Sequence, residues 1–208
     1  MDVERKYVKI AVTGGIGSGK STVCEILREE GYFVFSCDAI YARMIASKEF
    51  AMALEILFPG VTSGGKIDKK KLSSVVFSGD GYALCKLNAF THPLIMQNLF
   101  AETDKAAESA KALKTGKVVF AEVPLLFEEG YESLFDYVIV VERGEAERIK
   151  SVMDRDGCNE KAVRNRMSAQ FDYAKTDCFE GKENVFVLRN DCKKNELRER
   201  IDRLIENL

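Results

Sequence analysis

One stretch of the chain has the residue types and the spacing of a phosphate-binding loop. Residues 9–22 read KIAVTGGIGSGKST and fit G-x-x-x-x-G-K-[ST] at every fixed position from Gly14 to Ser21. Glycines let the backbone turn tightly and aim its N–H groups inward, and the N-terminus of a following helix adds partial positive charge. We expect Lys20 to reach the β- and γ-phosphates of a nucleotide and the Ser21 hydroxyl to bind Mg²⁺. The alternative, a glycine-rich turn before an ordinary helix, is disfavoured by the complete pattern. The residues expected at the nucleotide are Gly14, Gly15, Ile16, Gly17, Ser18, Gly19, Lys20, Ser21 and Thr22.

Two acidic residues are placed to act beside this loop. Asp38 follows an aromatic and β-branched run at 32–36, and Glu122 ends an apolar run at 118–122. Both runs are predicted strands, and ligands bind at the carboxyl ends of strands in open α/β sheets. Asp38 could accept or orient the proton of an attacking hydroxyl, and it could also cap a helix that starts at Ala39. Glu122 could hold Mg²⁺ through water or touch the substrate, or it could simply be a strand end that faces solvent.

Positive charge for a transferring phosphoryl group is available late in the chain. The segment 145–171 has helical spacing and is rich in Arg and Lys. Guanidinium groups on a mobile lid could close on the phosphates and stabilise developing charge, although most arginines in such a segment lie on the surface. The arginines considered for this role are Arg148, Arg155, Arg164 and Arg166.

The apolar runs around these residues predict an α/β fold. The predicted strands are 7–12, 32–36, 118–122, 135–142 and 183–188, and the predicted helices are 21–30, 39–57, 72–114, 145–171 and 194–208. The first strand, helix and second strand form a βαβ unit, which implies a parallel sheet with the second strand beside the loop. A mostly helical block of roughly 75 residues separates the second and third strands, which is too long for a plain crossover. We expect this block to be an insertion that closes over a substrate.

Composition limits the classes of function. With 208 residues the chain suits one domain with insertions, and its formal net charge of -2 gives no strong attraction to nucleic acid or to an anionic membrane. No apolar run approaches the roughly 18 residues of a membrane span, and the N-terminus lacks the apolar core of a secretory signal. The six cysteines are scattered without a C-x-x-C pair, which argues against zinc and disulfides and favours free thiols in a reducing compartment. We therefore expect a cytoplasmic protein, either a monomer or a small homo-oligomer.

Two further motifs are weak by themselves. His92 precedes Pro93 in LNAFTHPLI, near an expected helix start, where a lone histidine is more often a cap or a structural hydrogen-bonding group than a catalyst. Residues 154–157 formally fit the D-x-x-G of GTPases, but they interrupt a basic helical region instead of following a strand. No N-K-x-D motif occurs before the terminal helix, so a GTPase is disfavoured.

Four segments together resemble the dephospho-coenzyme A kinase family. They are VTGGIGSGKST, Asp38-Ala39, LNAFTHPLI around His92, and VVFAEVPLLFE at 118–128. The last two discriminate, because a glycine loop and a strand-tip Asp occur in many kinases. The spacing of Arg148, Arg155, Arg166 and Gln170 is similar to the family's lid, and the resemblance covers nearly the whole chain.

The resemblance implies a three-layer P-loop kinase fold, with a core (about 1–44, 116–142 and 176–208), a helical CoA-binding insertion (about 45–115) and a short lid (about 143–175). It implies transfer of the γ-phosphoryl group of ATP, bound with Mg²⁺, to the 3′-hydroxyl of the ribose in dephospho-CoA, the last step of coenzyme A biosynthesis. The catalytic residues would be Lys20, Asp38 and Arg148, and the metal ligand would be Ser21. Further ATP contacts would come from Arg155 and Asn190, and the acceptor contacts from Asp38, His92, Pro93, Glu122, Pro124 and Leu125.

The sequence departs from the family pattern at four places, one of them the start of the second helix of the lid, which reads Cys158-Asn159-Glu160 in place of the usual acidic start. Ile40 follows Asp38-Ala39 where the family usually has a second Asp. Glu122 stands where Asp is commoner, so its carboxylate reaches one methylene further. Residues 189–192 read RNDC in place of D-N-S-G, and the lost glycine predicts a different shape for the adenine-side loop.

Three other functions fit parts of the sequence. Another small-molecule kinase, acting on a nucleoside, gluconate or shikimate, would share the loop but not the H-P and E-V-P-L-L-F-E segments. A nucleotide-binding regulatory protein without catalysis would not need the carboxylate of Asp38. A nucleic-acid-binding P-loop ATPase is disfavoured by the net charge of -2 and by the lack of an aromatic and basic groove signal.

Overall fold

The computed structural model describes residues 7–109, 118–173, 179 and 181–208 of the chain. Cys178 and the predicted boundaries near residues 115 and 175 lie outside the described residues. The chain divides into two compact units: unit 1 comprises Met1–Phe35 and Lys105–Leu208, and unit 2 comprises Ser36–Asp104. The functional division into core, insertion and lid stays a prediction.

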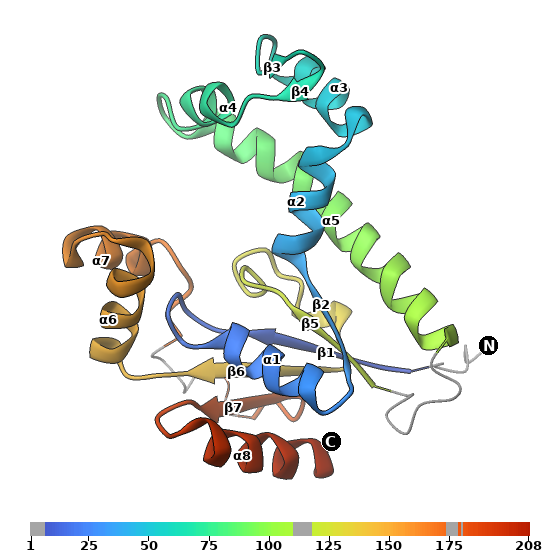
Figure 1. Ribbon diagram of the computed structural model, residues 1–208, viewed down its shortest axis with the longest axis vertical. Helices are drawn as coiled ribbons and strands as arrows, with labels where there is room; N and C mark the ends of the chain where they lie inside the picture. Colours follow the sequence, from blue (N-terminus) through green and yellow to red (C-terminus); the bar gives the residue numbers. More distant parts are fainter. Residues whose placement is uncertain (1–6, 110–117, 174–178, 180) are drawn as a thin grey trace. The chain divides into compact units, whose positions relative to one another are not determined.

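Unit 1 contains a five-stranded sheet in the order β2-β5-β1-β6-β7 (Figure 1). The strands are β1 (Val8–Thr13), β2 (Phe33–Ser36), β5 (Val118–Glu122), β6 (Tyr137–Glu142) and β7 (Val185–Arg189). Strand β1 pairs in parallel with β5 and β6, and β6 pairs in parallel with β7, which confirms the predicted α/β class and parallel sheet. Because β1 has a partner on each side and its last four residues are buried, the loop after Thr13 starts from the centre of the sheet.

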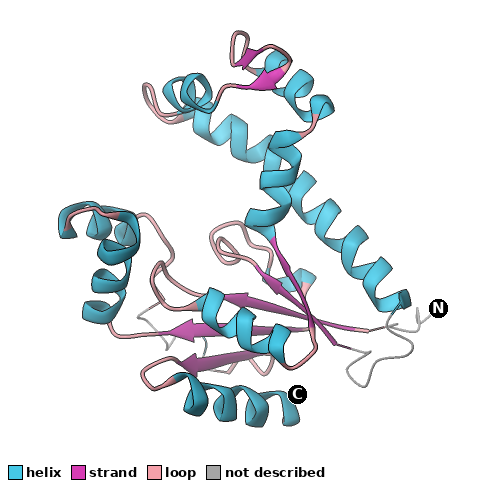
Figure 2. Cartoon of the chain, in the orientation of Figure 1, coloured by secondary structure: helices cyan, strands magenta, loops and turns pink. Residues whose placement is uncertain are grey.

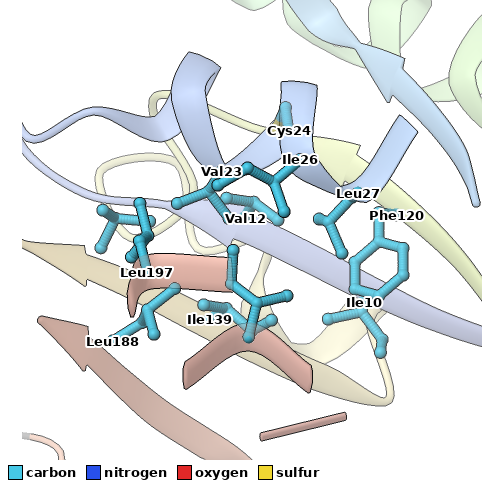
Figure 3. Close-up of a cluster of buried hydrophobic side chains, with 12 residues drawn as sticks. Ile10, Val12, Val23, Cys24, Ile26, Leu27, Phe120, Ile139, Leu188 and Leu197 are labelled. Atoms are coloured by element: carbon cyan, nitrogen blue, oxygen red, sulfur yellow. The ribbon is translucent and has the colours of Figure 1, made fainter. Parts of the chain in front are cut away.

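Helices α1 (Lys20–Glu29) and α8 (Lys194–Glu206) cover one face of this sheet and share a single core with it. Figure 3 shows the side chains of α1 and α8 packed against those of the strands. The labelled core residues are Ile10, Val12, Val23, Cys24, Ile26, Leu27, Phe120, Ile139, Leu188 and Leu197. Each large apolar side chain buried in this way contributes about 1.5–3 kcal/mol before entropy is counted. The core fixes α1 on β1, so the glycine loop is held at both ends.

The predicted position of the second strand is wrong. Strand β2 lies at the edge of the sheet, and β5 separates it from β1. The burial of the two strands explains the order. All four residues of β2 are only half-buried, whereas the three central residues of β5 are buried. The strand with the buried centre is thus the interior one beside β1, although it comes much later in the chain.

Unit 2 is mostly helical, with one small hairpin (Figure 2). Its elements are α2 (Cys37–Ala46), α3 (Lys48–Leu57), β3 (Thr62–Ser63), β4 (Lys66–Ile67), α4 (Lys69–Val76) and α5 (Tyr82–Ser109). Its own core contains Phe50, Leu54, Phe58, Val61, Leu72, Val76 and Leu87. The continuous helix predicted at 39–57 is wrong, because Ser47 ends α2 and its hydroxyl accepts a hydrogen bond from Phe50 N (3.1 Å) to cap α3.

A pair of helices follows β6, which a short 3₁₀ turn (Glu132–Leu134) precedes. Helices α6 (Glu145–Asp156) and α7 (Glu160–Ser168) pack together through Ile149, Val152 and Val163. Gly157 ends α6 with a φ of 63°, so the single helix predicted at 145–171 is wrong. The residues that fit D-x-x-G lie at this helix end. The sequence likewise places them in a helical region and not after a strand. Among the described residues, no helix is long and apolar enough to cross a membrane.

Candidate active site

The glycine loop connects β1 to α1 and leaves the N-terminus of α1 without a side-chain cap. Gly19 is the N-cap residue, with a φ of 94°. The uncapped N–H groups of the first turn are therefore available to an anion. Lys20 Nζ donates hydrogen bonds to Gly14 O (2.6 Å) and Gly15 O (3.1 Å), so the ammonium group lies across the loop. From this position it can meet phosphates bound there.

The loop serine and the acid at the tip of β5 lie together. Ser21 Oγ donates a hydrogen bond to Glu122 Oε1 at 3.1 Å. The sheet register produces this contact, because Glu122 pairs with Val12 and so ends beside the loop. A hydroxyl and a carboxylate oxygen are ligands that suit Mg²⁺, which is usually held by one or two protein groups together with phosphates and water. No group of three or more His, Cys, Asp or Glu side chains that could hold a metal occurs in the part of the chain described.

Cys24 lies one turn further along α1 and takes no part in this chemistry. Burial, reinforced by the charge of Glu122, raises the pKa of its thiol to about 12. The thiol therefore stays protonated at neutral pH, and it belongs to the buried core that joins α1 to the sheet.

Arg148 is the predicted lid arginine that contacts the loop. Its Nε donates a hydrogen bond to Ile16 O at 2.9 Å, and its guanidinium group lies against Gly15, where a Cβ would collide with it. Burial lowers the pKa of Arg148, and the charge of Glu145 opposes that shift. The side chain is placed to put positive charge beside a phosphate on the loop.

Asn190 also supports the loop from outside. Its Nδ2 donates to Ser18 O at 2.8 Å, and its own N–H donates to Glu142 O at 2.8 Å. The asparagine side chain lies so close to Gly19 that a Cβ there would collide with it. Asn190 therefore fixes the loop to the end of β6, and its contact with ATP stays a prediction.

Two residues at this site were not assigned from the sequence. Gln170 Oε1 accepts a hydrogen bond from Ile16 N at 2.7 Å. The Tyr173 hydroxyl lies 3.1 Å from Thr13 Oγ1 and 3.4 Å from a carboxylate oxygen of Glu128. The spacing of the lid residues marked Gln170 without a role, and no sequence signal marked Tyr173, because its contacts depend on how residues far apart in the chain fold together.

Unit 2 carries the predicted base and the histidine–proline pair. Asp38 lies in the first turn of α2 and is exposed. Ser36 caps this helix instead, through a weak hydrogen bond from Ala39 N to its Oγ (3.5 Å), so the alternative role of Asp38 as the cap is wrong. Pro93 lies inside α5 with His92 directly before it, so the expected nearby helix start is also wrong.

A groove with a volume of about 440 Å³ crosses the same unit. Its apolar lining includes Ile40, Met44, Phe50 and Leu94. Arg43 and Glu102 also line it and form an ion pair, with Arg43 Nη2 2.6 and 2.8 Å from the two carboxylate oxygens.

Comparison with known proteins settles the family. The family model for dephospho-CoA kinase matches residues 8–196. The chain belongs to the dephospho-CoA kinase family. A dephospho-CoA kinase of Thermus thermophilus is 38% identical over 171 residues, covering 82% of this chain and 79% of that protein. One from Fusobacterium nucleatum is 32% identical and covers 96% of this chain and 97% of its own length.

Solved structures agree with this membership. A Thermus thermophilus protein has a TM-score of 0.78 at 34% identity, covering 97% of this chain and 98% of its own. The dephospho-CoA kinase of Campylobacter jejuni has a TM-score of 0.63 at 26% identity, with 97% of each chain covered. A shikimate kinase of Bacteroides thetaiotaomicron, at 14% identity and a TM-score of 0.50, shares the fold alone. The chain is therefore a P-loop kinase of the dephospho-CoA kinase family.

The other three arginines predicted for the lid of this dephospho-CoA kinase family member pair with acids. Arg155 Nε and Arg166 Nη1 lie 2.7 and 2.6 Å from the two oxygens of Asp156. The side chain of Arg155 is 62% exposed, and its assignment to ATP stays a prediction. Arg164 Nη2 lies 2.7 Å from Glu160 Oε1, which is an exposed pair within α7.

The last two predicted acceptor residues follow β5. Val123 N donates to Val12 O at 3.0 Å and extends the pairing past Glu122. Pro124 is half-buried and Leu125 is 36% exposed, which leaves an apolar surface close to Glu122. Their contact with an acceptor stays a prediction.

Proposed function

We propose that this kinase transfers the γ-phosphoryl group of ATP to the 3′-hydroxyl of the ribose in dephospho-CoA, giving coenzyme A and ADP. The observation that carries the proposal is the family match over residues 8–196, combined with a complete glycine loop. The proposal is tested by measuring ADP formation with dephospho-CoA and, separately, with a nucleoside, gluconate and shikimate. Equal ADP formation with all acceptors, or none with dephospho-CoA, would refute the substrate assignment.

The donor half of the reaction belongs to unit 1. The N–H groups of the loop and the first turn of α1 bind the phosphates, and Lys20 and Arg148 neutralise charge that develops on the transferring group. Ser21 and Glu122 would hold Mg²⁺, which supplies further charge neutralisation when bound. Positioning and electrostatics do most of the work in phosphoryl transfer, and the fixed hydrogen bonds around the loop serve that purpose.

The acceptor half is assigned to unit 2, with Asp38 as the base. Its exposed carboxylate in the first turn of α2 is free to approach a hydroxyl group and to accept its proton. Asp38→Asn keeps the shape of the side chain and removes the basic oxygen. We expect kcat to fall about 10²- to 10⁴-fold while the Kd for ATP is unchanged.

The control for Asp38→Asn is Glu196→Gln, which removes an exposed acid from the first turn of α8. It reproduces the loss of a charge at a helix N-terminus, and its kcat should match that of the unmodified protein. An Asp38→Asn variant with normal turnover would exclude Asp38 as the base.

The groove in unit 2 suits the long arm of the acceptor. That arm alternates methyl and methylene groups with amides, and the groove combines apolar side chains with the Arg43–Glu102 pair. Asp38 and Ile40 lie two residues apart on α2, so the groove begins on the helix that carries the base. Ala53 of α3 also lines the groove, so Ala53→Phe should fill it, raise KM for dephospho-CoA and leave KM for ATP unchanged. The same variant should phosphorylate adenosine, which lacks the arm, as well as the unmodified protein does, and a parallel loss with both acceptors would contradict the assignment.

A further inference from the structure

Ile16 belongs to two structures at once, the glycine loop and the core of the lid helices. Its side chain packs against the cluster that joins α6 to α7, whose buried members are Ile149, Val152 and Val163. Most positions of the loop are glycine or small polar residues, so Ile16 is its one large apolar side chain. The side chain of Ile16 is therefore the apolar contact that the loop makes with the core between α6 and α7.

The backbone of Ile16 is bound to the same pair of helices. Its C=O accepts a hydrogen bond from Arg148 Nε at 2.9 Å, and its N–H donates to Gln170 Oε1 at 2.7 Å. Arg148 lies near the start of α6, and Gln170 follows the end of α7 at Ser168. Ile16 is therefore hydrogen-bonded both to the start of α6 and to the segment just after α7.

At Gly17, the next residue, the loop backbone lies directly against the backbone of α6. A Cβ built on Gly17 would lie 2.6 Å from Arg148 O and 3.0 Å from Arg148 Cα. Close-packed contacts of this kind transmit displacement instead of absorbing it. A movement of the loop tip must therefore move α6, and a movement of α6 must move the loop.

We infer that the tip of the phosphate loop is coupled to helices α6 and α7 through Ile16, so that a shift of either one moves the other, with Gln170 as the positioning residue for the Ile16 peptide. The inference rests on nucleotide binding at the loop, which is part of the proposed function. Binding of phosphates then biases the lid through the loop itself, in addition to the contact that Arg148 makes with the transferring group. A lid that hinged freely after β6 would carry no such link.

Hydrogen exchange of the full chain tests the coupling, with Mg·ADP as the added ligand. In the unmodified protein, Mg·ADP should slow exchange in the loop and also in α6 and α7. In Ile16→Ala, the loop should still be protected by saturating Mg·ADP, while the added protection of α6 and α7 falls about threefold or more. Lid protection in Ile16→Ala equal to that of the unmodified protein would overturn the inference.

Met153→Ala is the matched control, because Met153 packs against the same lid core from within α6. It weakens that core without removing the side chain that enters from the loop. Nucleotide should therefore still add protection to the lid in Met153→Ala, and an equal loss in both variants would show that Ile16 only stabilises the lid, which would overturn the coupling. Loop protection reports nucleotide binding separately. A protected loop beside an unaffected lid in the unmodified protein refutes this inference alone, whereas an unprotected loop refutes the proposed function as well.

Two substitutions of Gln170 separate its hydrogen bond from its bulk. Gln170→Glu keeps an oxygen that accepts from Ile16 N, and Gln170→Leu removes it. We expect the hydrogen-exchange protection of the Ile16 N–H to fall about tenfold in Gln170→Leu and to be substantially retained in Gln170→Glu, both measured without ATP because the added carboxylate would repel its phosphates. An equal fall in both variants, or no fall in Gln170→Leu, would refute the role of this hydrogen bond.

Discussion

Gly17→Ala should damage both the stability and the activity of the protein. Gly17 has a φ of 77°, which an L-residue adopts at a cost of roughly 1–2 kcal/mol. The new Cβ would also lie 2.6 Å from Arg148 O, which is a backbone atom and cannot rotate away. Forcing a group into such a packed position costs about 1–3 kcal/mol more. We therefore expect the free energy of unfolding to fall by about 2–5 kcal/mol.

The variant Gly31→Ala serves as a control, because it introduces the backbone strain without the steric collision. Gly31 ends the turn after α1 with a φ of 89°, and a Cβ built there meets nothing within 4 Å. This variant should lose only the roughly 1–2 kcal/mol of the left-handed conformation, and its kinase activity should be close to normal. Both variants are measured by denaturant unfolding and by ADP formation with saturating dephospho-CoA.

The result that would refute this reasoning is equal behaviour of the two variants. If Gly17→Ala lost no more stability than Gly31→Ala and kept its kcat/KM for ATP, then α6 would not press on the loop. We expect instead that the additional strain in Gly17→Ala lowers kcat/KM for ATP by at least about tenfold.

Three further predictions concern the carboxylates and the buried tyrosine. Glu122→Gln should raise the Mg²⁺ concentration that gives half the maximal rate about 10- to 100-fold, because its oxygen would no longer carry charge beside Ser21; an unchanged Mg²⁺ titration would exclude the acid from the metal site. Hydrogen bonds from Arg155 and Arg166 lower the pKa of Asp156 from 3.8 to about 2, so stability present at neutral pH should be lost as the pH falls from about 4 to about 2, and Asp156→Asn should lack this component in acid titrations of unfolding. Tyr173→Phe should lower the free energy of unfolding by about 1–3 kcal/mol, because the fully buried Thr13 would lose its hydrogen-bond partner. Burial also raises the pKa of Tyr173, so the unmodified protein should lose stability as the pH rises above about 10. The stability of the variant should depend less on pH in that range.

The strand–loop–helix geometry of the predicted donor site could be read from the sequence because it is local. The glycine loop, its lysine and Ser21 lie within one strand–loop–helix segment, and their spacing alone determines their geometry. Glu122 was also found, because a strand tip in a parallel sheet is identifiable from an apolar run. Its contact with Ser21 then follows from the register of β1 and β5.

The sequence could not predict features that depend on competition between distant segments. The predicted order of the strands was wrong, because β5 and not β2 lies beside β1. No feature in the sequence of β2 indicates an edge position. The break at Ser47 was missed for a different reason, since its capping hydrogen bond outweighs a helical pattern that continues through it. Tyr173 and Gln170 were missed as site residues because Thr13 and Ile16, the loop-side residues that they contact, are more than 150 positions away.

The pairing of β1 with β5 has a consequence for synthesis of the chain on the ribosome. Val8 pairs with Val118, so the central ladder of the sheet joins residues on either side of all of unit 2. Closing such a long segment costs chain entropy before any of the pairing's hydrogen bonds form, which makes it intrinsically slow. Strand β1 leaves the ribosome well before β5 does, and the ladder between them cannot form until β5 emerges. During that interval the nascent chain exposes the apolar residues of β1, which later form the centre of the sheet. A chaperone would then have the largest effect by covering these residues.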